Sequence, residues 1–352
     1  MRTMEHAYHF ESLRKDVDAE LATLFLEMRK ETSHPFIASL YEWILGFVCS
    51  GGKRLRPVLT LAALKGLGKP IGQEERRAAV ALELLHASTL IHDDIMDEDT
   101  RRRGSPSLFC HYQGLFRKAY GEAKGTGALF ATSSARFGAS QGIIAGNLLY
   151  VLGFFCLDRN CRASEVYRSA AIAVNEGQVL DLLGELEDIS EESYLAMTEK
   201  KTASLFIASA KMGAVLGNAD ERSTNALQSF ALSIAMAFQL QDDIIDISPD
   251  AAKGNTFASD IRNSKKTLLV IRALAASPQA GRLREILAKK EKAADDLKEA
   301  VAIIGNSSLQ SVKDTIEGYY DKGICSLERA SLSSEGREFL AWLAGQMVHR
   351  KR

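Results

Sequence analysis

This chain of 352 residues has few prolines, few cysteines and a low net charge. Each of these features argues against a class of structure or of binding partner. Only six prolines occur, none between Pro106 and Pro249, so long helices can form there without interruption. The five cysteines lack the paired spacing of a zinc site, which favours reduced thiols in a cytosolic protein. The formal net charge is −1, so nothing in the composition indicates attraction to nucleic acid or to an anionic membrane.

No segment has the pattern of a signal peptide or of a membrane span. Residues 1–30 are charged and amphipathic, without an apolar signal core. The longest apolar stretch, residues 142–157, contains Asn147 and is shorter than the roughly 20 residues that a spanning helix needs. We therefore expect a cytoplasmic protein with no integral membrane segment and no nucleic-acid partner.

Helix-forming residues dominate the sequence, and the alternating pattern of strands is rare. A hydrophobic fraction of 46% is ample for a large core, so we predict one all-α domain over residues 1–352. The expected helices are 9–48 with a break near Pro35, a helix ending at 67, 74–96, 140–157, 163–183, 190–216, 222–247 and an interrupted region 267–352. Polar loops are expected at 98–106 and 248–265, and a mobile loop or a broken helix at 111–137.

Two aspartate triplets of the same form lie inside apolar sequence. They are Asp93-Asp94-Ile95-Met96-Asp97 and Asp242-Asp243-Ile244-Ile245-Asp246. Because a helix turns about 100° per residue, the first and last aspartates of each triplet lie about 40° apart on one face. Like charges at this spacing repel, and burial near a core raises the cost further. Shared divalent cations would compensate both triplets, and two solvated acidic helix ends are the alternative.

The ligand chemistry indicates which cation to expect. Carboxylates without histidine or cysteine select Mg²⁺ or Mn²⁺ over zinc. Mg²⁺ keeps several waters and binds through one or two carboxylates together with substrate phosphates. Two helices with such carboxylates are therefore expected to hold a polyphosphate.

Short basic clusters support a phosphate ligand, although each one alone would more often be a solvated surface. A glycine turn beside a basic cluster lets main-chain amides and side chains converge on an anion. The clusters are Lys53 and Arg56 after the turn at 50–52, Arg102 and Arg103 after the first triplet, Lys200-Lys201-Thr202, and Lys265-Lys266-Thr267.

Together these motifs resemble those of the trans-isoprenyl diphosphate synthases of the polyprenyl synthetase family. The residues within the motifs are most similar to those of archaeal geranylgeranyl diphosphate synthases. Seven blocks occur in that family's order within about residues 50–270, and such a set is far more specific than one motif. The blocks are Gly51 to Pro57, His86, the first triplet, Arg102-Arg103-Gly104, Lys201-Thr202, Phe238-Gln239 with the second triplet, and Asp260 to Thr267. The resemblance implies the isoprenoid synthase fold, a bundle of long helices around a central cavity.

The resemblance also implies a role for each matching residue. Magnesium ligands would be Asp93, Asp97 and Asp242, supported by Asp94, Asp243 and Asp246. The allylic diphosphate would be held by Arg102, Lys201, Thr202, Gln239 and Lys265; of these, Lys201, Thr202 and Gln239 would act in catalysis, with Thr202 stabilising the developing cation. Isopentenyl diphosphate would be held by Lys53, Arg56, His86 and Arg103. His86 on its own would more often be a core histidine.

The implied activity is that of a chain-elongating prenyltransferase. Isopentenyl diphosphate would be condensed with dimethylallyl, geranyl or farnesyl diphosphate to give an all-trans product. Breaking the allylic C–O bond places negative charge on diphosphate, which Mg²⁺, arginine and lysine stabilise. The resemblance implies three Mg²⁺ ions per active site, with Mn²⁺ as a substitute, and a homodimer. The released diphosphate would accept the proton lost from the product.

Product length is expected to depend on the residues beneath the first triplet. Ser88 and Thr89 lie roughly one helical turn before Asp93, at ~1.5 Å per residue. Bulky aromatic residues at these positions stop growth at fifteen carbons in the family. The small side chains therefore predict geranylgeranyl diphosphate, with twenty carbons, or a longer product, with Leu84 or Leu85 as a possible floor of the tunnel.

Two departures from the family pattern stand out, and two other functions remain open. Asn147 replaces the usual aspartate after Gly146, and residues 107–137 form a longer connection than usual, predicted to be an inserted loop. A terpene cyclase would have an Asn/Ser/Glu metal motif in place of the second triplet. A non-catalytic regulatory subunit would lack some of the aspartates or arginines.

Overall fold

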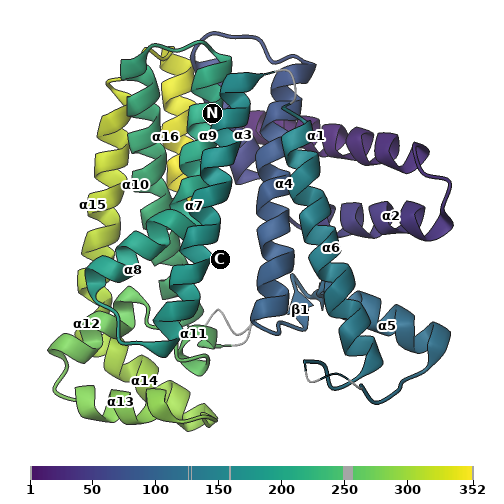
Figure 1. Cartoon of the computed structure of the whole chain (residues 1–352). Helices are drawn as coiled ribbons and strands as arrows, with labels where there is room; N and C mark the ends of the chain where they lie inside the picture. Colours follow the sequence, from purple (N-terminus) through teal and green to yellow (C-terminus); the bar gives the residue numbers. More distant parts are fainter. Residues whose placement is uncertain (1, 126, 128, 158–159, 249–256, 351–352) are drawn as a thin grey trace. The chain divides into compact units, whose positions relative to one another are not determined.

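The computed structural model describes residues 2–125, 127, 129–157, 160–248 and 257–350 (Figure 1). The described residues are mostly helical, with one two-stranded hairpin among them, which confirms the all-α prediction. They cluster into two compact units, one with residues up to Leu61 and Pro70–Tyr167, the other with Ala62–Lys69 and the residues from Arg168 onward. The prediction of a single domain stays a prediction.

The first unit is built around helix α4 (Gln73–Met96), whose middle is buried on every side. Its elements are α1 (Arg2–Lys30), α2 (Pro35–Cys49), the first part of α3 (Leu55–Gly66), α4 (Gln73–Met96), β1 (Arg101–Arg102), β2 (Ser105–Pro106), α5 (Leu108–Tyr120) and α6 (Ser133–Phe155). Helix α4 contacts both α1 and α6. Every residue from Ala78 to Leu85 is buried, including Glu83, which pairs with Arg54.

The connection before α6 contains more structure than the sequence indicated. The predicted polar loop at 98–106 includes the antiparallel hairpin of β1 and β2. Of the two expectations for residues 111–137, the broken helix is correct: α5 ends at Tyr120, and α6 begins after the N-cap Thr132. The Thr132 hydroxyl accepts a hydrogen bond from the amide of Ala135, at 3.2 Å.

The second unit is a bundle centred on α10. Its elements are most of α7 (Cys161–Leu186), α8 (Glu191–Thr198), η1 (Glu199–Ala203), α9 (Ser204–Leu216), α10 (Glu221–Asp246), α11 (Ser259–Arg262), α12 (Leu268–Ala276), α13 (Ala280–Ala288), α14 (Ala294–Ser307), α15 (Leu309–Leu327) and α16 (Ser334–Val348). Helix α10 packs against α9, α15 and η1, and its N-cap Asp220 accepts from the amide of Ser223. The second acidic triplet ends this central helix.

Two smaller findings concern the composition. All five cysteines are free thiols. Among the described helices, Ser133–Phe155 is long and apolar enough to cross a membrane, and 44% of its most apolar window is buried. Neither finding fixes the location of the protein in the cell.

Candidate active site

A glycine turn in the first unit holds the basic block that follows it. Gly51 has a φ of 71°, and a Cβ on Gly52 would collide with the guanidinium of Arg54. That guanidinium is buried and pairs with Asp18 and with Glu83, each at 2.8 Å. Arg54 therefore anchors the turn and leaves ligand binding to its neighbours.

The neighbours gather positive charge around a histidine. Burial, followed by the charges of Arg56 and Arg103, lowers the pKa of His86 well below its usual value, so the imidazole is neutral at pH 7. Burial lowers the pKa of Arg56 only to about 10, which leaves it charged. The structure thus brings Arg56, His86 and Arg103 close together, and exposed Lys53 lies in the turn beside them. This cluster is suited to an anion.

The hairpin after α4 directs two arginines to different partners. Arg102 pairs with Ser105, while Arg103 and Gly104 have φ values of 51° and 80°, as in a type I′ turn. Arg103 Nη1 donates to the carbonyl of Ser50 at 2.7 Å, which ties the hairpin tip to the glycine turn. Arg102 Nε donates to Asp94 Oδ1 at 2.6 Å.

The first acidic triplet has one internal and two outer carboxylates. Asp94 is buried beneath Arg102; burial raises its pKa to about 6, although Arg102 opposes the shift. Asp93 and Asp97 are partly exposed, and the Asp97 amide donates to the Asp93 carbonyl at 2.8 Å as α4 ends. The outer pair therefore lies on one side of the helix end, as the spacing predicted.

In the second unit, a widened helical turn presents Lys201 and Thr202. The π-helical segment η1 begins where α8 ends, a feature that is frequent at functional sites. A Cβ on Gly177 of α7 would collide with the main-chain nitrogen of Lys201, so glycine permits the close approach of the two helices. Lys201 Nζ pairs with Asp181 Oδ2 at 2.5 Å, whereas Lys200 pairs with Glu176.

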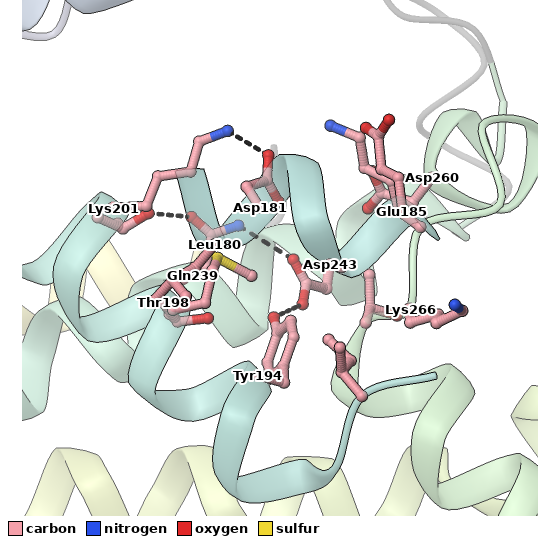
Figure 2. A pocket seen from close by; sticks show the side chains of 16 residues that line it. Leu180, Asp181, Glu185, Tyr194, Thr198, Lys201, Gln239, Asp243, Asp260 and Lys266 are labelled. Atoms are coloured by element: carbon pink, nitrogen blue, oxygen red, sulfur yellow. Dashed lines mark hydrogen bonds and ion pairs between the residues drawn. The ribbon is translucent and has the colours of Figure 1, made fainter. Parts of the chain in front are cut away.

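The cavity beside this turn collects most of the residues predicted for the allylic site in the second unit (Figure 2). Its volume is about 130 Å³. The lining includes Lys201, Thr202, Gln239, Asp243, Lys265 and three residues without an assigned role, Asp181, Tyr194 and Asp260. Lys266, which also lines the cavity, is held by the carbonyl of Glu187 and by Asp188.

Hydrogen bonds fix Gln239 and Asp243 within the cavity (Figure 2). Thr202 Oγ1 donates to Gln239 Oε1, and Gln239 Nε2 donates to Asp243 Oδ1, each at 3.0 Å. The hydroxyl of Tyr194 donates to the other oxygen of Asp243. Burial and the nearby charge of Asp260 raise the pKa of Asp243 to about 8.

The outer aspartates of the second triplet already have partners. Asp242 pairs with Arg350, whose guanidinium lies 4.1 Å from the centre of the Phe238 ring. Asp246 accepts from the main-chain amides of Ser259 and Asp260, both at 3.1 Å, and so caps α11. Asp242 is therefore balanced by a cation, and Asp246 has a supporting role in the local structure.

The carboxylates near the site suit Mg²⁺ better than a metal that is coordinated by protein ligands alone. Among the described residues, no group of three or more histidine, cysteine, aspartate or glutamate side chains converges on one point. Mg²⁺ typically uses only one or two carboxylates and completes its shell with water and phosphate oxygens. Asp93 with Asp97 in the first unit, and Asp242 in the second, each offer one or two carboxylates of that kind; the roles assigned to individual residues stay predictions.

The two residues expected to set product length differ in burial. Ser88 is buried, and Thr89 is partly buried with its hydroxyl bonded to the carbonyl of His86 at 2.8 Å. Thr89 precedes Asp93 by four residues and so lies on its face of α4, whereas Ser88 points about 140° away. On Gly146 of α6, a Cβ would meet the ring of His92, and Asn147 beside it is exposed.

Three site residues were missed by the sequence reasoning. Asp181 had a usable signal, since it is a single carboxylate inside the apolar run Val179 to Leu183. Tyr194 and Arg350 had none, because only the packing of α8 and of the C-terminal segment brings them to α10.

The comparisons with known proteins identify the family. Residues 38–304 match the family described as polyprenyl synthetase. The chain belongs to that family. It is 32% identical to the geranylgeranyl diphosphate synthase of Sulfolobus acidocaldarius over 334 residues, 90% of this chain and 92% of that protein. It is 33% identical to the geranylfarnesyl diphosphate synthase of Aeropyrum pernix over 326 residues, 87% and 92% of the two chains.

Solved structures agree on the fold of this polyprenyl synthetase. A geranylgeranyl pyrophosphate synthase from Corynebacterium glutamicum, complexed with isoprenyl diphosphate and magnesium, is 24% identical with a TM-score of 0.86, over 97% of this chain and 99% of that one. A polyprenyl synthase from Caulobacter crescentus, complexed with calcium and isoprenyl diphosphate, is 26% identical with a TM-score of 0.77, over 97% and 98%. The predicted fold, family and enzyme class, a prenyltransferase that makes isoprenyl diphosphates, are confirmed.

Proposed function

We propose that this enzyme condenses isopentenyl diphosphate with an allylic diphosphate to give geranylgeranyl diphosphate or a longer all-trans product. The observation behind the proposal is that one chain contains two sets of basic residues, one in each unit. One is the cluster of Arg56 and Arg103 around His86, and the other lines the cavity with Lys201 and Lys265. A condensation of two diphosphates needs both.

The two sets suit different substrates. The first has no acidic triplet residue among its members, and its neutral imidazole can donate one hydrogen bond to a phosphate oxygen. We assign it to isopentenyl diphosphate, whose C–O bond stays intact. The second set belongs to the same unit as Asp242, and we assign it to the allylic diphosphate. Arg102, Asp93 and Asp97 belong to the first unit, and the roles proposed for them are those that the family resemblance implies.

Divalent metal is proposed as the cofactor. When bound, Mg²⁺ would neutralise the charge that develops on the leaving diphosphate. Asp93, Asp97 and Asp242 would hold it, while Asp94, Asp243 and Asp246 orient the helix ends. The binding of magnesium or calcium by related synthases supports the choice, and a cluster of three ions and substitution by Mn²⁺ belong to the same proposal.

The residues around the cavity can stabilise a cation without a dedicated base. Thr202 and Gln239 present oxygen atoms and amide dipoles fixed by hydrogen bonds, so no reorganisation is needed as positive charge develops. Lys201, held by Asp181, can contact the diphosphate. The departing diphosphate would then accept the proton from the condensation product.

We also propose a homodimer. On α6, Ile143, Ile144, Val151, Phe154 and Phe155 are between 45% and 62% exposed. Within the second unit, α7 exposes Ile172, Val179 and Leu183 to a similar degree. Exposed apolar faces of this kind mark interaction surfaces. A second copy of this chain would cover them, and the molar mass in solution tests the proposal.

The activity is tested by incubating purified protein with isopentenyl diphosphate, Mg²⁺ and each of the three allylic primers, and then sizing the products. We expect twenty carbons or more. A cyclised hydrocarbon in place of an elongated diphosphate would indicate a terpene cyclase. No product from any primer, together with stimulation of an active synthase, would indicate a regulatory subunit.

Product length has its own test in Thr89→Phe. The phenyl ring would lie on the face of α4 below Asp93, so we expect a shift to fifteen carbons or fewer with turnover largely retained. Ser88→Phe is the comparison variant: Ser88 is 1% exposed, so the ring would overpack the site at a cost of about 1–3 kcal/mol. An unchanged product distribution in both variants would refute this account of the tunnel.

A further inference from the structure

Tyr194 is the first residue in a row of hydrogen bonds that runs through Asp243 and Gln239 (Figure 2). The row ends at Thr202. The row crosses three elements: Tyr194 on α8, Thr202 on η1, and Gln239 with Asp243 on α10. Its three links are Thr202 to Gln239, Gln239 to Asp243, and Tyr194 to Asp243. Tyr194 and Asp243 are each only 4% exposed, so water does not readily replace either partner.

The chemistry of the groups sets the direction of every bond in this row. In its ionised form, which a nearby Mg²⁺ would favour, the Asp243 carboxylate accepts hydrogen bonds and donates none, so it receives the NH₂ side of the Gln239 amide and the hydroxyl of Tyr194. The carbonyl side of the amide then faces Thr202 and takes its proton. The remaining lone pairs of the Thr202 oxygen are left for the cavity, where a positive charge would be stabilised by them.

The orientation of Asp243 depends on its two neutral donors. The partners that the structure gives its carboxylate, within the described residues, are Tyr194 and Gln239, while Asp260 and Asp246 lie near enough to repel it. Removing the Tyr194 hydroxyl would leave one oxygen of a buried carboxylate without a donor. The carboxylate would then turn to find another, and the Gln239 amide would lose the constraint that fixes its direction.

We propose that Tyr194 is a positioning residue that fixes the Gln239 amide, through Asp243, so that the Thr202 oxygen faces the site where the allylic cation forms. This inference rests on the proposed function, because it assumes that the cavity holds the allylic substrate. Tyr194 itself touches no reacting atom. Its effect is on the electrostatics of the cation and not on the binding of either diphosphate.

The first test compares Tyr194→Phe with Tyr167→Phe. Both rings are buried and each hydroxyl makes a hydrogen bond, but that of Tyr167 goes to the carbonyl of Tyr150, at 2.7 Å, in the first unit. For Tyr194→Phe we expect kcat to fall about tenfold, as for the loss of one hydrogen bond to a charged group, with KM for isopentenyl diphosphate unchanged. Tyr167→Phe should lower the melting temperature and leave kcat unchanged. A purely structural role would give the same pattern for both.

The second test asks whether Tyr194 acts through Thr202. In a Thr202→Val background the oriented hydroxyl is absent, so adding Tyr194→Phe should reduce kcat by less than twofold further. A full tenfold further loss would show that the two residues act independently and would overturn the inference. Elongation by the wild-type protein tests the proposed function separately, since its failure would remove the reference for both variants.

A binding measurement gives a readout that does not depend on turnover. Calorimetry with Mg²⁺ would compare two unreactive ligands, a prenyl thiolodiphosphate without positive charge and an ammonium analogue of the allylic cation supplied with diphosphate. We expect Tyr194→Phe to weaken the ammonium analogue about fivefold to tenfold and to leave the thiolodiphosphate unchanged. Equal weakening of both ligands, or of neither, would refute the inference.

Discussion

The two acidic triplets have the same form, but their buried middle aspartates are stabilised in different ways. Asp94 accepts from the guanidinium of Arg102, and its pKa is about 6. Asp243 accepts from the neutral donors Tyr194 and Gln239 beside Asp260, and its pKa is about 8. A charged partner offsets much of the cost of a buried carboxylate, whereas neutral donors near a second acid offset less. Two motifs with the same aspartate spacing therefore differ in charge balance before any metal binds.

Substitution of the outer aspartates should have the largest effect on activity. For these positions we expect the two triplets to give the same result. Asp93→Ala and Asp242→Ala each remove a proposed metal ligand, so we expect kcat/KM to fall at least about 10²–10³-fold, the loss typical of one preorganised electrostatic group. The Mg²⁺ concentration needed for half-maximal activity should rise in both variants. Steady-state kinetics over a range of Mg²⁺ concentrations measures both quantities.

Glu98→Gln is the matched control, because Glu98 is an exposed acid one residue beyond Asp97. It should retain near-normal activity. If Asp93→Ala were near normal while Asp242→Ala was inactive, the two triplets would not share one task. The assignment of Asp93 would then be wrong.

The middle aspartates should differ in stability, which is the next largest effect. Arg102→Gln leaves the Asp94 carboxylate buried without its cation; Arg102 itself is 26% exposed, so we expect a loss of about 2–3 kcal/mol in the free energy of unfolding. Tyr194→Phe, which removes a neutral donor from Asp243, should cost about 1 kcal/mol. Urea unfolding at pH 7.5 with chelator measures both.

The double variant Arg102→Gln with Asp94→Asn checks the cause of that loss. Removing the buried charge should restore part of the stability, because the penalty comes from an unpaired carboxylate. If the double variant were less stable than Arg102→Gln alone, the ion pair would not be the source of the difference between the two triplets.

The sequence was sufficient for the parts of the site that depend on local spacing. Helical periodicity placed Asp93 and Asp97 on one face, and glycine and proline placed the breaks on either side of α3. The hairpin of Arg101 to Pro106 was missed, although an X-Gly turn between short segments is a known hairpin signal. The π-helical turn at Lys201 was beyond sequence reasoning, because it depends on the contact with Gly177 from another helix.

Charge balance was also beyond sequence reasoning. Both triplets have aspartates at the same three positions. Nothing in the motifs therefore indicates that Asp94 is hydrogen-bonded to an arginine and Asp243 to a tyrosine. Those partners come from a hairpin eight residues away in one case and from a helix 49 residues away in the other. Tertiary packing, not the motif, decides the pKa of each buried carboxylate.

The smallest predicted effect is a change of stability with pH in the absence of metal. It tests most directly the difference in pKa between Asp94 and Asp243. Both pKa values lie above the ~3.9 of an unfolded aspartate, so between the two values the folded protein binds more protons and its stability falls as pH rises. The contribution of Asp94 to the free energy of unfolding is largely lost by pH 6.5. The contribution of Asp243 continues to fall up to about pH 8. Between pH 6.5 and 8.0, Asp243 should account for a decline of up to about 1.4 kcal/mol per pH unit.

Urea unfolding at pH 6.5 and pH 8.0, with chelator present, measures how stability changes with pH. Comparing the wild type with two variants isolates the contribution of Asp243. Asp243→Asn should flatten the decline, because it removes the group that titrates, while Asp94→Asn should keep the wild-type slope. Excess Mg²⁺ should flatten the wild-type slope as well, since a bound cation favours the ionised carboxylates near it. Equal slopes in all three chelated proteins would mean that Asp243 is ionised throughout, and the contrast between the two triplets would then lie in geometry alone.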